Sequence, residues 1–134
     1  MVDIENDVFD HVYTFVKAMY PNVSMASERI ESPSEFPFVS FEESSNTTYE
    51  QSLTGDGKEN HSVVTFTVEV YSNKLPGRKK EARDIAQAVD LAMESLGITR
   101  TMMGPMPNMF NIGVYRIVAR YRCVVGKDKT IYRR

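Results

Sequence analysis

Residues 62–96 constrain the fold more than any other part of the chain, because a period of two gives way there to a period of 3.6. Between residues 62 and 71, apolar and polar side chains alternate, which is typical of a strand with one buried face. Between residues 78 and 96, apolar side chains recur at steps of three and four, which indicates an amphipathic helix. Because strand and helix each need cover for an apolar face, we expect a two-layer α+β domain.

The other patterns extend this unit. Residues 3–20 carry a helical apolar stripe that ends at Pro21. Extended segments are expected at 38–43, 47–53 and 113–125, with a weak short strand within 22–31 and an edge strand at 129–132. The expected buried stripe of the first helix consists of Ile4, Val8, Val12, Phe15, Val16 and Met19.

Two glycine-containing segments predict where the elements turn. Gly55 and Gly57 predict a hairpin tip within residues 54–60, and Gly97 stands where a left-handed helix cap belongs. We therefore expect a single α+β domain over residues 1–134. In it a mainly antiparallel β-sheet packs against two α-helices, and long β-hairpin and loop extensions project from the core.

Composition limits the classes of partner. The formal net charge of −2 argues against overall attraction to nucleic acid or anionic membrane. The single cysteine, Cys123, forms no internal disulfide. A secretory signal begins with basic residues and continues with apolar ones, whereas the first ten residues of this chain are acidic. No stretch approaches the roughly 18 apolar residues of a membrane span. We expect a soluble protein of intracellular origin.

Few residues suggest catalysis. His11 and His61 have no metal-ligand spacing around them and are expected to be solvated. Cys123 lies on the apolar face of the last strand and is expected in the core rather than as a nucleophile. The glycines near Lys58 lack the Ser or Thr and the helix of a phosphate-binding loop. Pairs such as Glu42 and Glu43 have no partner that would shift a pKa. We expect no enzyme, no metal and no cofactor.

Residues 101–111 are unusual because they hold four of the eight methionines. Gly104, Pro105 and Pro107 predict a loop there. Methionine suits adaptable contact surfaces, so the segment is expected either to contact a partner or to fold back over the core of its own domain. Its apolar residues are Met102, Met103, Met106, Met109 and Phe110.

Basic side chains gather in two places. Arg78, Lys79 and Lys80, with Arg83, open the second helix, where positive charge opposes the helix dipole. This basic turn is expected either to be solvated or to dock on an acidic partner.

The second basic group lies on one face of the last strand and consists of Arg116, Arg120 and Arg122. These arginines are expected to pair across strands with Glu69 or Glu43, or to present a cationic surface to a partner or to the phosphates of passing DNA.

The order of elements resembles that of the tail terminator and tail completion proteins of long-tailed bacteriophages, including those that join tail to head. The resemblance spans essentially the whole chain. It rests on the strand ending in Tyr71-Ser72-Asn73, on the helix containing Ile85, Ala86 and Val89, and on three further segments. These segments are the N-terminal helix, Phe36-Pro-Phe-Val39 and the arginine- and tyrosine-rich final strand at 115–122.

This resemblance implies a structural virion protein without enzymatic activity or cofactor. Such proteins form a hexameric ring that caps the tail tube, contacts the tube protein and a head–tail connector or stopper, and lets genomic DNA pass through its lumen. No membrane is involved. The expected location is the tail–neck region of the virion, with assembly in the host cytoplasm.

For this chain the resemblance makes two surfaces candidates. The methionine segment and Arg78–Lys80 would be the oligomer or partner contact, and Arg116, Arg120 and Arg122 the lumen or inter-ring surface. A head-side connector or minor capsid protein is an alternative in the same class. A dimeric regulatory module that binds a small ligand, or a hydrolase with an unmarked site, are alternatives in other classes.

Overall fold

The computed structural model describes residues 2–28, 30, 33–48, 61–107 and 113–132. Within these residues the chain runs from a helix through two strands to the long central strand, and from there through a second helix to three more strands. In order these elements are α1 (Glu5–Met19), β1 (Ser24–Ala26), β2 (Phe38–Thr48), β3 (His61–Ser72), α2 (Arg78–Ser95), β4 (Thr99–Met106), β5 (Tyr115–Gly126) and β6 (Ile131–Tyr132).

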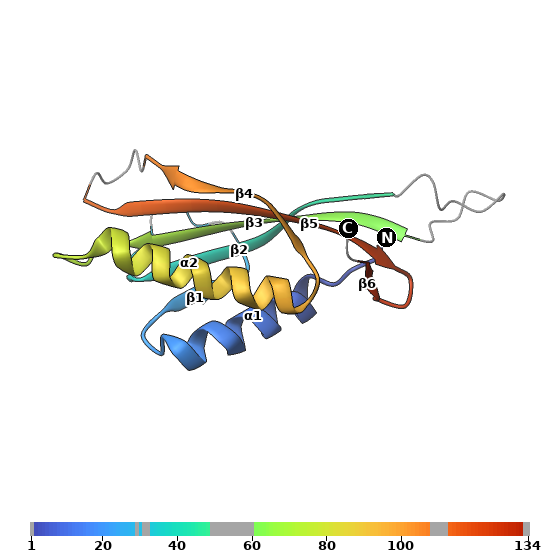
Figure 1. Ribbon diagram of the computed structural model, residues 1–134, viewed down its shortest axis with the longest axis horizontal. Helices are drawn as coiled ribbons and strands as arrows, with labels where there is room; N and C mark the ends of the chain where they lie inside the picture. Colours follow the sequence, from blue (N-terminus) through green and yellow to red (C-terminus); the bar gives the residue numbers. More distant parts are fainter. Residues whose placement is uncertain (1, 29, 31–32, 49–60, 108–112, 133–134) are drawn as a thin grey trace.

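The strands form one mixed sheet, and both helices cover the same face of it (Figure 1). The strand order is β1-β2-β3-β5-β4, with β6 beside β5. Only β1 and β2 pair in parallel among the described strands. The architecture is therefore the expected two-layer α+β domain.

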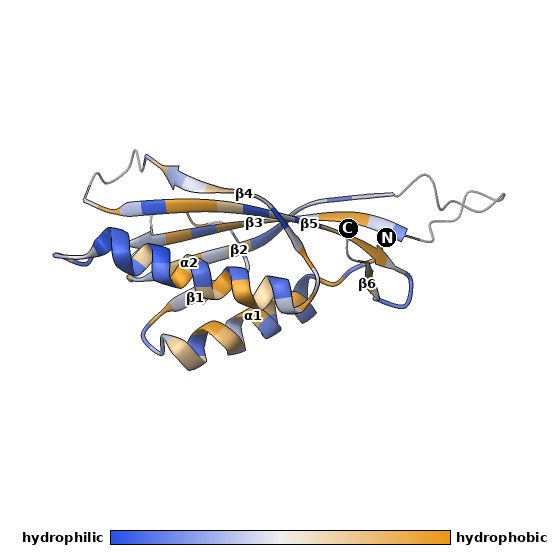
Figure 2. Cartoon of the chain, in the orientation of Figure 1, coloured by the Kyte–Doolittle hydropathy of each residue, from blue (hydrophilic) through white to orange (hydrophobic). Residues whose placement is uncertain are grey.

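The core fills the space between the sheet and the helices. The alternation in β3 directs Val64, Phe66, Val68 and Val70 toward the helices, where all four are buried. Alternate residues of β5, including Tyr121, meet them from the neighbouring strand. The apolar stripes of α1 and α2 close this core, and the first turns of α2 are hydrophilic (Figure 2).

The helix predictions are confirmed, apart from one side chain. α1 buries Val8, Val12 and Val16, but Met19, the last residue of the helix, is 51% exposed. After α2, Gly97 has a φ of 80°. This left-handed conformation favours glycine and ends the helix as expected.

The prediction of a loop at residues 101–111 is wrong for the part that the structure describes. Residues 99–106 form β4, although they include Gly104 and Pro105. A proline has no amide hydrogen to donate, but β4 is an edge strand, where one side of the backbone needs no partner. A register shift between Arg100 and Met102 further distorts this edge.

Two expected extended segments prove to be one strand. β2 continues through a register shift between Glu43 and Ser45, so the polar run there makes a bulge rather than a break. The remainder of the second segment, 49–53, and the predicted hairpin tip at 54–60 lie outside the described residues. At the other end of the chain, β6 pairs with β5, as expected for residues 129–132.

A smaller apolar cluster lies on the face of the sheet away from the helices. Phe38 and Tyr71 face each other across β2 and β3 and pack with Val114. Half-buried Ala26 and Phe36 pack against this cluster. The Ser40 hydroxyl donates a hydrogen bond to the Glu28 carbonyl at 3.1 Å. The segment between β1 and β2 therefore covers one end of the otherwise polar sheet face.

We predict that Phe66→Ala lowers the free energy of unfolding by about 3–5 kcal/mol, because it leaves a cavity in a packed core. Phe66 is fully buried, and its ring centroid lies 5.3 Å from that of Phe41. Chemical denaturation of the purified variant measures the change. The control is Leu91→Ala, which removes a side chain that is 52% exposed on α2. An equal loss in both variants would contradict the placement of the core.

Candidate functional site

A groove of about 540 Å³ lies between α2 and the edge strand β4. Among the strands, α2 packs mainly on β3 and β5, so β4 extends beyond the area that the helix covers. Arg83 and Gln87 border the groove from α2, one helical turn apart, and both are exposed. The other side is formed by Arg100, Thr101, Met102, Met103, Gly104 and Pro105, and the floor by Tyr115 and Ile117.

A fixed carboxylate orients the guanidinium of Arg100. Asp90 lies on α2, three residues beyond Gln87, and one of its oxygens lies 3.4 Å from Arg100 Nη1. The other carboxylate oxygen of Asp90 accepts a hydrogen bond from the Tyr121 hydroxyl at 3.0 Å. Burial, and then the charge of Asp90, raise the pKa of Tyr121 well above its usual range. The tyrosine therefore stays protonated and holds Asp90 in place.

A second groove, of about 480 Å³, adjoins the first, since Pro105 and Tyr115 line both. Its remaining lining residues are Arg78, Met106, Pro107, Val114 and Arg116. Arg78 donates a hydrogen bond to the Gly113 carbonyl at 3.1 Å, which ties the start of α2 to the segment preceding β5. The two grooves adjoin along β4, and together they are hereafter called the β4 groove.

Arg116 is held by a carboxylate on the sheet face away from the helices. It forms a short ion pair with Glu69, and Glu69 also accepts a hydrogen bond from the Tyr71 hydroxyl at 3.0 Å. Burial lowers the pKa of Arg116, but the hydrogen bond and charge of Glu69 outweigh it and raise the pKa. Burial and the charge of Glu69 raise the pKa of Tyr71 to about 12. This network fixes Arg116 at the edge of the second groove.

The structure brings together residues that the sequence assigned to two surfaces. Met102 and Met103 line the first groove, Met106 lines the second, and Arg78 and Arg116 meet there. Met103 also packs partly on the core, so the segment contacts its own domain as well as lining an open surface. Met109 and Phe110 lie outside the described residues.

The other predicted basic residues are separate from the groove. Lys79 is exposed at the start of α2, and Lys80 forms an ion pair with Asp84 at 2.8 Å. Arg120 is exposed and Arg122 is half-buried, both on the open face of the sheet. The expected cross-strand pairing holds for Arg116 with Glu69. Pairing with Glu43 is wrong, because Glu43 follows Phe41 on the helix-covered face.

Gln87, Arg100 and Tyr115 are among the groove residues that the sequence analysis missed. Arg100 was missed because residues 101–111 were interpreted as a loop, which left no strand face on which to place it. The signal that could have found Gln87 was the spacing of Arg83, Gln87 and Asp90 on one side of the second helix.

An acidic surface lies at the opposite edge of the sheet, hereafter the β2 edge. Glu42 is half-buried on the open face, and Glu43 lies near Asp3 and Glu5 on the helix side. The carboxylate of Glu5 accepts a hydrogen bond from the Glu43 amide at 2.7 Å. Burial, then Glu5 and Asp3, raise the pKa of Glu43 above its ordinary value of 4.5.

The remaining candidates for chemistry have structural surroundings. Cys123 is buried, and burial, followed by the charge of Glu43, raises the pKa of its thiol to about 11. His11 is exposed and lies 2.9 Å from the Ser95 hydroxyl, as expected of a surface histidine. His61 is instead half-buried against the Tyr132 ring, 5.3 Å between centroids, because β6 folds back over it.

The β4 groove carries arginine side chains that can bind anions. Guanidinium groups stay protonated at all physiological pH values and bind carboxylates or phosphates through directed hydrogen bonds. Within the described ranges, no three His, Cys, Asp or Glu side chains gather where they could hold a metal ion. None of the described helices has the length and apolarity required to cross a bilayer.

The chain matches no family model, and no curated protein matches it.

We predict that Glu43→Gln stabilises the fold at neutral pH. A raised pKa means that the folded state favours the protonated carboxyl, so ionisation costs stability once the pH exceeds the unfolded value of 4.5. The variant should therefore unfold at higher denaturant concentration at pH 7, and the difference should disappear as the pH falls below 4.5. Exposed Glu28→Gln is the charge-matched control. A destabilised Glu43→Gln protein at pH 7 would contradict the proposed environment.

Proposed function

We propose that this protein is a structural subunit of a phage virion that assembles as a hexameric ring, caps the tail tube and joins it to the head or neck. The observation that carries the proposal is the β4 groove, which combines fixed guanidinium groups with exposed or half-exposed methionines at one end of the molecule. Such a surface is suited to binding a partner. A subunit of an assembly requires a surface of this kind.

The surroundings of the groove support a role in contact. Near the start of α2, Leu75 is 75% exposed, and Met106 on β4 is 42% exposed. Basic Lys74 and Lys79 lie exposed beside Leu75 in the chain. Apolar side chains surrounded by charge are typical of protein–protein contact surfaces. The order of elements, an N-terminal helix, a long antiparallel core and a second helix with a basic first turn, resembles that of the phage family described above.

A dimeric module that binds a small ligand is the second candidate. The volume of the first groove, about 540 Å³, lies in the usual range of ligand pockets. In that case the protein would be a stable dimer and the arginines would bind an anionic ligand. A head-side connector would share the ring architecture and differ in its neighbours.

Mass measurement separates these proposals. The purified chain should be hexameric by native mass spectrometry and sedimentation, or should become hexameric on contact with tail tubes. Deletion of the gene from the phage genome that carries it should give tails of abnormal length or tails without heads. A stable dimer that is indifferent to tail tubes, or normal head-attached tails after deletion, would overturn the proposal.

A further inference from the structure

The two lateral edges of the sheet carry opposite charge. At one edge the β4 groove presents Arg83 and Arg100. At the other edge, Glu42 and Glu43 lie on β2 with Asp3 and Glu5 beside them. Neither Arg83 nor Glu42 forms an ion pair within the part of the chain that the structure describes. The charges therefore remain available to another molecule.

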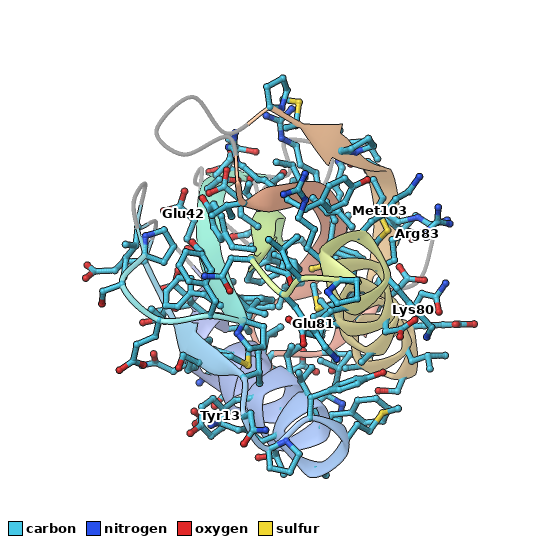
Figure 3. All side chains as sticks on the ribbon, turned by 90° about the vertical axis from the view of Figure 1, so that its left-hand side faces the viewer. Tyr13, Glu42, Lys80, Glu81, Arg83 and Met103 are labelled. Carbon is cyan, nitrogen blue, oxygen red and sulfur yellow. The ribbon has the colours of Figure 1, made fainter. Side chains whose placement is uncertain are left out.

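These surfaces cannot meet within one copy of the chain. β3 and β5 separate β2 from β4 in the sheet, and Glu42 lies on the side of the molecule away from Arg83 and Met103 (Figure 3). When two complementary patches lie at opposite edges of one subunit, the patch of one copy can contact the other patch of a second copy. The two copies are then related by a rotation other than a two-fold one. Such a contact is heterologous, and it closes into a ring when the rotation allows.

The lengths of the two surfaces also match. β1 pairs only with residues Phe38, Val39 and Ser40 of β2, so residues 41–48 have no strand on their outer side among the described residues. This stretch and the eight-residue β4 are each about 26 Å long at roughly 3.3 Å per residue. A ridge and a groove of similar length can lie along one another.

Side chains rather than backbone groups must form this contact. On β4, Pro105 has no amide hydrogen, and the register shift at Arg100/Met102 disturbs the strand edge. On β2, a similar shift follows Glu43, and Glu5 already accepts the Glu43 amide. Both edges are therefore poor templates for an added strand. Guanidinium–carboxylate pairs have no such requirement.

We propose that the β2 edge of one copy occupies the β4 groove of the next, with the carboxylate of Glu42 facing the guanidinium groups of Arg83 and Arg100. This inference rests on the proposed function, because it names the contact that would build the ring. Asp90 and Tyr121 hold Arg100 in position before the partner arrives, which reduces the entropy lost on binding. The contact weakens as ionic strength rises, because salt screens charges at its rim.

Charge reversal tests the proposal. Arg83→Glu and Glu42→Arg should each weaken self-association roughly 100-fold or more, since like charges would then face each other. Sedimentation of the folded variants at several protein concentrations measures this, with circular dichroism to verify folding. Lys127→Glu and Asp10→Arg are matched controls, because each reverses an exposed charge that neither lines the β4 groove nor lies on β2. These controls should associate as the unmodified chain does.

Restoration by a charge swap gives the sharper result. The double variant Arg83→Glu/Glu42→Arg should assemble again, and an equimolar mixture of the two single variants should form alternating assemblies. Unchanged association of both single variants would overturn this contact while leaving the ring intact. If Arg83→Glu lost DNA binding while the mass of the assembly stayed the same, the groove would be a phosphate-binding surface. That result would also overturn the proposed contact.

Further outcomes separate this contact from the proposed function. A chain that stays monomeric at high concentration, alone and with tail tubes, overturns both. An open chain of subunits, or a ring of another size, that both reversals dissociate and the double variant restores would keep the groove contact and overturn the hexameric ring.

Discussion

The packing of one face of β3 and β5 against two helices is the constraint on which the rest of the structure depends. Each strand of a sheet has two faces, and in this chain only one is apolar along most of its length. Two helices are enough to cover that face. Because neither helix extends over β4, the edge strand is left with an uncovered flank, and the β4 groove follows from this shortage of cover.

The opposite face of the sheet is satisfied in another way. At one end Phe38 and Tyr71 are covered by the segment between β1 and β2. Toward the middle, Glu69 is nearly inaccessible to solvent and binds both Arg116 and Tyr71. A buried carboxylate needs such partners, because its transfer from water is costly. Arg116 thus has a structural role on the sheet face away from the helices, and it also borders the second groove.

The sequence predicted what depends on local periodicity and missed what depends on neighbours. The period of two in β3 and β5 assigned the faces correctly, since side-chain direction alternates with each residue. β4 was missed because Gly104 and Pro105 break a strand in general but are tolerated at a sheet edge, and edge position is a property of the whole fold. The interpretation of Glu43 as an arginine partner was wrong for a similar reason. Neighbouring residues of a strand point to opposite faces of the sheet, and Glu42, not Glu43, lies on the face that carries the arginines of β5.

The candidate site was predictable only in part. Its methionines and Arg78 stood out by composition, but the groove itself joins Arg83 of α2 to Arg100 of β4, and no local pattern shows that these two segments lie side by side. Pro105 has a further consequence. It is the next-to-last residue of the edge strand β4 and donates no backbone hydrogen bond, so this edge is a poorer template for an added strand. An edge of this kind is less prone to seed stacks of identical strands between copies of the chain.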